Sequence, residues 1–362
     1  MTTGNPTDGS NEEPVRELPE QTWDEVMVEG DADKIRDRLQ GELSCLLKQW
    51  SRRLQRYCVL VLYSDWTLGY EDVDRIYQAL NDSNPRQRKD VLLVLVSRGG
   101  YPIPAYQISK LCRESAHEKF IVCVPRHAKS AATMICLGAD AVHMGPLGHL
   151  GPIDPQWESA QGGPVSGLAL QNSLLTITQW VAEYPGSQGM WAEVLLRDKT
   201  FDYGDIGEFE RITESAAQYA ERLLVAGRSA PDRAAKIAKR LVYEYKDHGF
   251  AIDRDEARAI FGEDSVVVSS NELSFGEEVY RLISKVDKGL EAINFNGSNT
   301  LYGGVKVVGS LNDDVILGPP TARQRGAIRR PEGDSESNQH TSFVWPGESV
   351  MVRDRSRVSF SG

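Results

Sequence analysis

Residues 91–100 of the chain read VLLVLVSRGG, and residues 120–133 read FIVCVPRHAKSAAT. Each stretch opens on an uninterrupted apolar run of strand length, Val91–Ser97 in the first and Phe120–Val124 in the second. Uninterrupted apolar strands are typical of parallel sheets that are covered on both faces. The first run ends in a pair of glycines, and the second leads to a serine that opens a short apolar helix. If the two strands are neighbours in one sheet, their loops face the same crevice.

Helices and strands alternate on both sides of these two units. Upstream, Lys34–Arg56 carries an apolar stripe with helical spacing, and Tyr57–Tyr63 is a further apolar run of strand length. Further helices are expected over Glu71–Leu80, over Pro104–Ser115 and from Ser130 to about Leu137. Three apolar strands separated by helices predict an α/β fold with a parallel sheet and flanking helices.

Helical patterns dominate the second half of the chain. They cover Leu168–Val181, Glu208–Val225 and a segment that begins after Pro231. We expect this half to form a helical extension that packs around a site made elsewhere. Two late strands are expected over Leu301–Val308 and Asp314–Leu317, where they either cover a sheet edge or build a subunit contact.

Composition narrows the range of partners. The 362 residues are 40% apolar, enough for a substantial core, and their formal charge of −11 argues against general adhesion to nucleic acid or anionic lipid. No apolar run approaches the ~20 residues that span a bilayer, and the N-terminus is polar and acidic, so we expect a cytoplasmic protein. The five cysteines form no close CxxC pair and are expected to be core thiols. No metal-site spacing or phosphate loop is present, so no cofactor is expected.

The ends of the chain differ from its middle. Residues 1–21 are rich in Gly, Pro, Asn, Thr and Glu, and residues 321–362 begin with an equally polar stretch. Such segments bury too little apolar surface to offset the entropy that is lost on ordering. We therefore expect a disordered tail over 1–21, a folded domain over 22–320 and a mostly flexible tail over 321–362.

Two loops carry the chemical signal of the sequence. Gly99 and Gly100 follow a buried strand, and residues without a Cβ let backbone amides approach a ligand closely. A tight turn would explain the glycines alone, and a helix N-cap would explain Ser130 alone. Ligands of open parallel sheets, however, bind beyond the carboxyl ends of the strands, where both loops lie. Together the loops predict a serine nucleophile beside amides that stabilise an oxyanion, as in a serine hydrolase.

An ordered set of short motifs carries a resemblance to a known family. The motifs are Ser97-Arg98-Gly99-Gly100, Ser130-Ala131-Ala132-Thr133, Leu137-Gly138-Ala139-Asp140, Met144-Gly145-Pro146 and Leu150-Gly151-Pro152-Ile153-Asp154-Pro155-Gln156. Over roughly residues 55–262 the chain resembles the serine dehydrogenase proteinase family, within the Clp protease and crotonase fold. It is similar, more distantly, to the Clp proteolytic subunit and to signal peptide peptidase A. The resemblance implies a Clp/crotonase-type sheet, a homo-oligomer, Ser130 as nucleophile and an oxyanion hole made by amides of Gly99, Gly100 and Ala131.

The sequence offers more than one general base. The Clp pattern has a histidine where this chain has Asp154, and the resembling family has the order Ser, Asp, His, which implies Asp154 as the acid and His248 as the base. A triad is defined by geometry and roles, so chain order does not restrict it. Asp154 also has a plainer interpretation, as a carboxylate that closes a turn before a proline.

Two other bases stay open at this point. Lys199 is a candidate because signal peptide peptidase relatives use a lysine, and a desolvated lysine of lowered pKa can act as a base. His149 is a candidate if its glycine-flanked loop folds back toward the serine. Lys129 and His127 are nearer in sequence, but we expect them to line the loop or to face solvent.

Three classes of function follow from these residues. The leading one is hydrolysis of peptide bonds in a peptide or protein substrate, through an acyl-enzyme on Ser130. The second is a crotonase-type enzyme acting on an acyl-CoA thioester, which needs the same amides but usually carboxylates in place of a nucleophile. The third is a non-catalytic assembly or binding module, which the fold by itself does not exclude.

Overall fold

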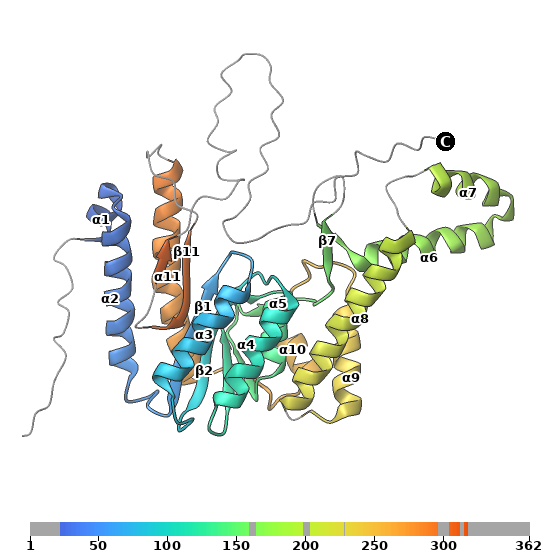
Figure 1. Cartoon of the computed structure of the whole chain (residues 1–362). Coiled ribbons are helices and arrows are strands. Elements are labelled where there is room, and N and C mark those ends of the chain that lie inside the picture. Colours follow the sequence, from blue (N-terminus) through green and yellow to red (C-terminus); the bar gives the residue numbers. More distant parts are fainter. Residues whose placement is uncertain are drawn as a thin grey trace, which may run out of the picture.

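The computed structural model describes residues 22–158, 164–197, 203–227, 229–295, 304–311 and 315–317. Within these ranges, helices cover both faces of a central sheet (Figure 1). In order across the sheet, the strands of its main path are β10 (Val266–Val267), β5 (Ala141–Met144), β3 (Phe120–Val124), β2 (Asp90–Ser97), β1 (Tyr57–Ser64), β11 (Val305–Ser310) and β12 (Val315–Leu317). The predicted α/β class, a parallel sheet with flanking helices, is confirmed.

Four parallel strands form the centre of this sheet. β1 and β2 pair from Tyr57 opposite Asp90 to Ser64 opposite Ser97, and every residue of both strands is buried. β3 pairs with β2, and β5 pairs with β3, both in parallel. Because the four strands run in one direction, the loops that follow them gather at one edge. The helices that link them are α3 (Tyr70–Ser83), α4 (Pro102–Ser115) and α5 (Ala131–Leu137).

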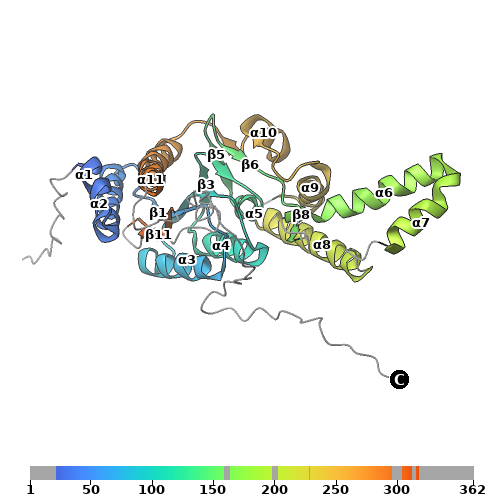
Figure 2. The same cartoon turned by 90° about the horizontal axis from the view of Figure 1, so that it is seen from above.

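Each face of the sheet has its own hydrophobic core. Successive residues of a strand point to opposite faces, so Leu93 and Leu95 of β2 enter one core while Leu92 and Val94 enter the other. The first core lies under α3, α4 and α5. Figure 2 shows that a second layer of helices covers the other face of the sheet, on the side opposite α3 and α4. The helices of that second layer are α1 (Trp23–Glu29), α2 (Ala32–Trp50) and α11 (Asn271–Phe295).

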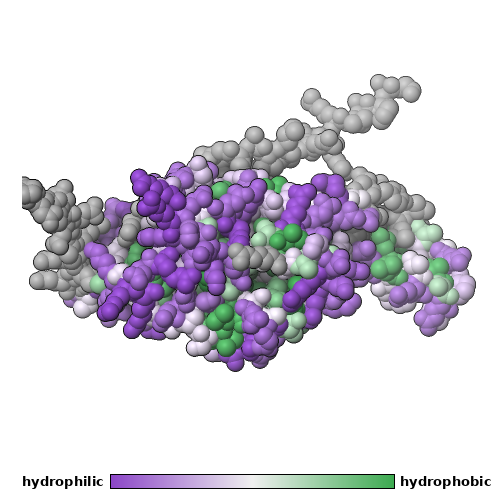
Figure 3. Space-filling model, turned by 90° about the horizontal axis from the view of Figure 1, so that it is seen from below, coloured by the Kyte–Doolittle hydropathy of each residue, from purple (hydrophilic) through white to green (hydrophobic). Residues whose placement is uncertain are grey.

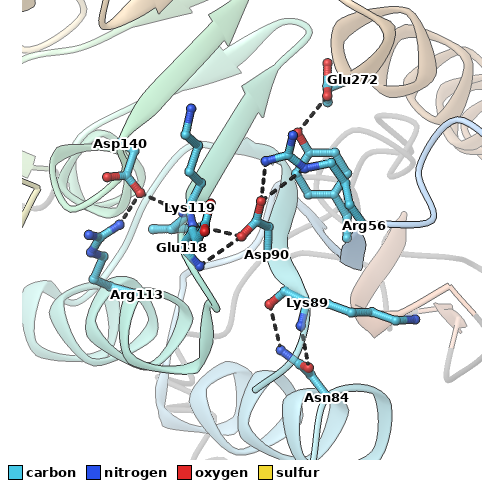
Figure 4. A network of polar contacts seen from close by, with 11 residues as sticks. Arg56, Asn84, Lys89, Asp90, Arg113, Glu118, Lys119, Asp140 and Glu272 are labelled. Carbon is cyan, nitrogen blue, oxygen red and sulfur yellow. Dashed lines mark hydrogen bonds and ion pairs between the residues drawn. The ribbon is translucent and has the colours of Figure 1, made fainter. Parts of the chain in front are cut away.

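Ionic contacts hold the amino ends of the strands in place. Asp90, at the start of β2, accepts hydrogen bonds at 2.9 Å from the amides of Glu118 and Lys119 and pairs with Arg56. Asp140, just before β5, accepts a hydrogen bond from the first amide of β3 at 2.8 Å and pairs with Arg113. Figure 4 shows these contacts side by side. They stabilise the edge opposite the loops that follow the strands, and leave those loops available for chemistry.

The predicted helical extension is confirmed for the described part of the second half. Apolar residues of α8 and α9 join the core on the α4 and α5 side. Two further helices, α6 and α7, form a hairpin that projects away from the sheet (Figure 1). The elements of this half are α6 (Gly167–Glu183), α7 (Gln188–Arg197), α8 (Tyr203–Ala226), α9 (Pro231–Lys239), the π-helical turn η2 (Arg240–Glu244) and α10 (Arg254–Phe261).

Several boundaries differ from the sequence prediction. The helix expected over 34–56 ends at Trp50, because the chain then turns through residues 51–56 before entering β1. The first late strand begins at Val305 and pairs antiparallel with β1, so it extends the sheet at that edge. The predicted tails, 1–21 and 321–362, lie outside the described residues. Among the helices that are described, none is both long and apolar enough to cross a bilayer.

Candidate active site

The double-glycine turn lies directly against the serine loop. Gly99 has a φ of +99°, and a Cβ added to it would lie 2.6 Å from Lys129 O and 3.0 Å from Ser130 Cβ. A Cβ on Gly100 would lie 2.3 Å from Leu68 N. Real Cβ atoms do not approach other atoms this closely, so both positions require glycine. The structure therefore places the glycine turn and Ser130 side by side, as the argument from strand order required.

Short strand pairs hold the serine loop in place. β4 (His127–Ala128) pairs with β2 through Ala128 opposite Ser97, and Lys129 N donates to Ser97 O at 2.9 Å. After the serine, every residue of α5 is buried. Thr133 Oγ1 in that helix donates to Ala128 O at 2.6 Å and so ties the helix back to β4. The backbone before and after Ser130 is thus fixed by the sheet and by the core.

Ser130 itself has a strained backbone. Its φ is +51° and its ψ is −121°, a region that residues with a Cβ rarely occupy, at a cost of about 1–3 kcal/mol. Its side chain makes no capping hydrogen bond to α5, and within the described ranges its hydroxyl has no hydrogen-bond partner. The plain helix-cap interpretation of Ser130 is therefore wrong. Such strain is characteristic of residues whose orientation serves a function.

The backbone amides of Gly100, in the glycine turn, and of Ala131, at the first position of α5, are not hydrogen-bonded to any described group. The amide of Gly99, by contrast, donates to Ser97 Oγ at 3.1 Å. Gly99 therefore matters for the Cβ that it lacks. The amides of Gly100 and Ala131 remain able to donate hydrogen bonds to an oxyanion.

Asp154 and His248, 94 positions apart in the chain, meet at this edge of the sheet. Asp154 is 3% exposed, and its Oδ1 lies 2.8 Å from His248 Nδ1. Its Oδ2 accepts a hydrogen bond from Ser166 Oγ at 2.7 Å, and Ser166 in turn caps α6 by accepting from Leu168 N at 3.2 Å. Both oxygens of Asp154 are thus used by side chains, which its interpretation as a turn-closing residue does not explain.

The chain around Asp154 and His248 explains why they meet. β6 (His149–Leu150) pairs with β4 on one side and with β9 (Ile252–Asp253) on the other, so the segments before Asp154 and after His248 are neighbours. Ile153 N also donates to Leu241 O, in η2, at 3.0 Å. The strand β4 that precedes Ser130 is part of the same small ladder. All three residues of the implied triad therefore come from segments that adjoin this ladder.

The two alternative bases have different outcomes. His149 lies near the serine loop, with its ring 6.1 Å from the ring of His127, and its Nδ1 is 3.3 Å from Leu147 O. Burial lowers the pKa of His149, and within the described ranges no carboxylate orients its ring. Lys199 lies outside the described residues. Of the candidate bases that the structure describes, His248 has a buried carboxylate at Nδ1.

Sequence reasoning missed Ser166 and the partners of Lys129. Ser166 has the form of an ordinary N-cap, and nothing in its spacing from Asp154 predicts a contact with that carboxylate. Lys129 was expected to line the loop or to face solvent; it is half-buried, and its ammonium donates to the carbonyls of Gly249 and Phe250 at 3.2 Å and 2.7 Å. Among the described residues, no group of three or more His, Cys, Asp or Glu side chains is arranged to hold a metal ion.

Known proteins that are similar to the chain include proteases. No family model matches it. An uncharacterised protein of Methanocaldococcus jannaschii is 35% identical over 86 residues, which span 24% of this chain and 29% of that protein. A mutant of the 1510-N membrane-bound stomatin-specific protease aligns with 73% of this chain and 93% of its own, at 15% identity and a TM-score of 0.39. ClpP1 from Listeria monocytogenes aligns with 63% of this chain and 99% of its own, at 12% identity and a TM-score of 0.35.

Replacing Gly100 with alanine is expected to damage the site through the backbone. The new Cβ would meet Leu68 N at 2.3 Å, and because backbone cannot rotate away, the turn must shift. We expect a loss of about 1–3 kcal/mol in the free energy of unfolding, measured by urea denaturation. Gly207→Ala is the matched control, since nothing lies within 4 Å of its added Cβ, and it should leave stability unchanged or higher. Equal stability of the two variants would contradict the close approach.

Proposed function

We propose that this protein is a serine peptidase that cleaves peptide bonds through an acyl-enzyme on Ser130. His248 is the general base, Asp154 orients it, and the amides of Gly100 and Ala131 form the oxyanion hole. The observation that carries this proposal is the 2.8 Å contact between the buried Asp154 carboxylate and His248 Nδ1, on segments that adjoin the loop of a strained serine whose hydroxyl has no hydrogen-bond partner among the described residues. The motif resemblance to the serine dehydrogenase proteinase family supports the same roles.

The geometry suggests how each group acts. Because His248 Nδ1 faces the carboxylate, that nitrogen carries the proton and leaves Nε2 free to accept the proton of Ser130. The Ser130 oxygen then attacks the substrate carbonyl, and the oxyanion that forms accepts hydrogen bonds from the two amides. The protonated imidazole gives its proton to the departing amine, and a water molecule that His248 activates releases the acyl group.

A fluorophosphonate probe tests the proposal directly. Such a probe reacts with a serine hydroxyl that a base activates, so the wild-type protein should be labelled at Ser130, as located by mass spectrometry of tryptic peptides. The heat-denatured protein, in which the triad is dispersed, should not be labelled. A folded protein that resists the probe would contradict the peptidase. If the unlabelled protein turns over acyl-CoA thioesters, the crotonase alternative replaces the peptidase proposal. If it does not turn them over, the binding-module alternative replaces the peptidase proposal.

We also propose that the protein self-associates through the arm formed by α6 and α7. Within the described part of this arm, large apolar side chains are exposed, including Trp180 at 46% and Tyr184 at 61%. Figure 3 shows apolar surface at the end of the molecule where this arm projects. Glu183 is the single charged residue among the 17 of α6, so two copies that meet along this helix bring few charges into the interface. A second copy of the chain is therefore our proposed occupant.

Replacing Trp180 with aspartate is expected to weaken self-association by at least about 100-fold in dissociation constant, because buried tryptophans dominate interface energies. Sedimentation velocity at micromolar concentrations measures this change. Tyr77→Asp is the control, since Tyr77 is 52% exposed on α3, away from the arm, and its substitution should leave assembly unaltered. A monomeric wild type, or an unchanged assembly of the Trp180 variant, would contradict the proposed interface.

A further inference from the structure

Lys129 connects the serine loop to the loop that carries His248. Its ammonium donates hydrogen bonds to Phe250 O at 2.7 Å and to Gly249 O at 3.2 Å. Its aliphatic stem lies over Gly151, where an added Cβ would approach Lys129 Cδ to 2.6 Å. Burial lowers the pKa of the Lys129 amine, although the nearby Asp247 opposes this change. The side chain is therefore packed along a defined path between two loops.

The bonds join the immediate neighbours of two proposed catalytic residues. Lys129 directly precedes Ser130, and Gly249 directly follows His248. Other hydrogen bonds of the loop, such as Phe250 N to Asp247 O at 3.0 Å and Gly249 N to Asp247 Oδ1 at 2.9 Å, are internal and shape it as a turn. They do not fix where that turn lies relative to the serine. The Asp154 contact anchors the imidazole to the acid but not to the nucleophile.

We propose that Lys129 is a positioning residue that holds the His248 loop against the serine loop, so that the imidazole faces the Ser130 hydroxyl. This inference rests on the proposed peptidase function and adds a residue to it. An ammonium suits the task because it has three donors and no acceptor, and its bonds to carbonyl oxygens are charge-assisted. Lys129 is not the base in this arrangement, since its nitrogen is directed to two backbone carbonyls of the opposite loop.

Two variants distinguish the role of the Lys129 ammonium from that of its aliphatic stem. Lys129→Met keeps an unbranched apolar side chain but removes the donors, whereas Lys129→Arg keeps both stem and donors. In the methionine variant we expect amide hydrogen exchange of the turn at Asp247–Phe250 to accelerate at least about tenfold, because the carbonyls lose their anchor. We expect kcat for peptide hydrolysis to fall at least about tenfold at unchanged KM, since substrate contacts stay in place. The arginine variant should recover most of both losses.

Lys110→Met is the matched control, because Lys110 is an exposed lysine of α4 whose partner is Glu114 at 3.6 Å, and it should change neither measurement. Circular dichroism should show all three variants folded. Unchanged exchange in Lys129→Met would overturn the positioning role. A pH profile of kcat/KM that loses its acidic limb in that variant would also overturn it, since this would make Lys129 the base. If exchange accelerates but the probe fails to label the wild type, the loop anchor stands and the peptidase function falls.

Discussion

Replacing Ser130 with alanine is expected to abolish both covalent labelling and peptide hydrolysis. Loss of the nucleophile in triad peptidases lowers kcat by a factor on the order of 10⁶, and what remains comes from substrate binding and the oxyanion amides. The substitution removes a hydroxyl that has no hydrogen-bond partner among the described residues, and alanine meets the same backbone strain as serine. Steady-state hydrolysis of a casein-type substrate and gel fluorescence of the probe measure the two effects.

Stability is the internal control for this variant. Because neither a hydrogen bond nor packing is lost, the free energy of unfolding should change by less than about 0.5 kcal/mol. A variant that is folded to the same extent but inactive then assigns the loss to chemistry. Retained hydrolysis within tenfold of wild type would show that another group attacks the substrate, and the assignment of Ser130 would be abandoned.

Replacing Asp154 with asparagine should have the second largest effect, a fall in kcat of about 10⁴-fold. Ser166 accepts a hydrogen bond from Leu168 N and uses its own proton toward position 154, so the asparagine carbonyl would turn to Ser166. The amide NH₂ would then face His248 Nδ1, which must become an acceptor. The imidazole proton moves to Nε2, and the base can no longer take the proton of Ser130.

Ser166→Ala is the comparison that separates the two contacts of Asp154. It removes the 2.7 Å bond to Oδ2 but leaves the carboxylate at His248, so we expect a loss of only about tenfold in kcat. Discontinuous assays of peptide hydrolysis over a range of pH give kcat for both variants. If Asp154→Asn keeps activity within tenfold of wild type, the carboxylate does not orient the base, and His248 loses its support as part of a triad.

The sheet was predictable because burial on both faces leaves a simple trace in the sequence. Val91–Ser97 and Phe120–Val124 are apolar without interruption, a composition typical of parallel strands that lie between two helical layers. The pairing of β11 with β1 was not predictable, because an antiparallel strand from the far end of the chain has no local signal of its partner. The end of the helix at Trp50 was missed for a similar reason, since the turn that follows still carries helical spacing.

The site, too, has parts that the sequence predicts and parts that it does not. Ser130 and the glycine turn could be placed from the sequence, because each follows a buried strand of known direction. The distinction between the bonded amide of Gly99 and the unbonded amide of Gly100 depends on backbone angles that no residue type specifies. Asp154 and His248 were chosen through family resemblance, and their contact depends on ladder pairs between short strands that carry no pattern of their own.

Because Ser130 has a positive φ, selection for stability and selection for activity favour different residues at this position. Glycine would relieve a strain of about 1–3 kcal/mol at this position. Its greater conformational freedom in the unfolded chain would offset roughly 0.5–1 kcal/mol of that gain. A laboratory screen for heat resistance alone would therefore drift toward Ser130→Gly and discard the hydroxyl in the process. Directed evolution of this protein for use at high temperature has to keep a turnover assay in every round.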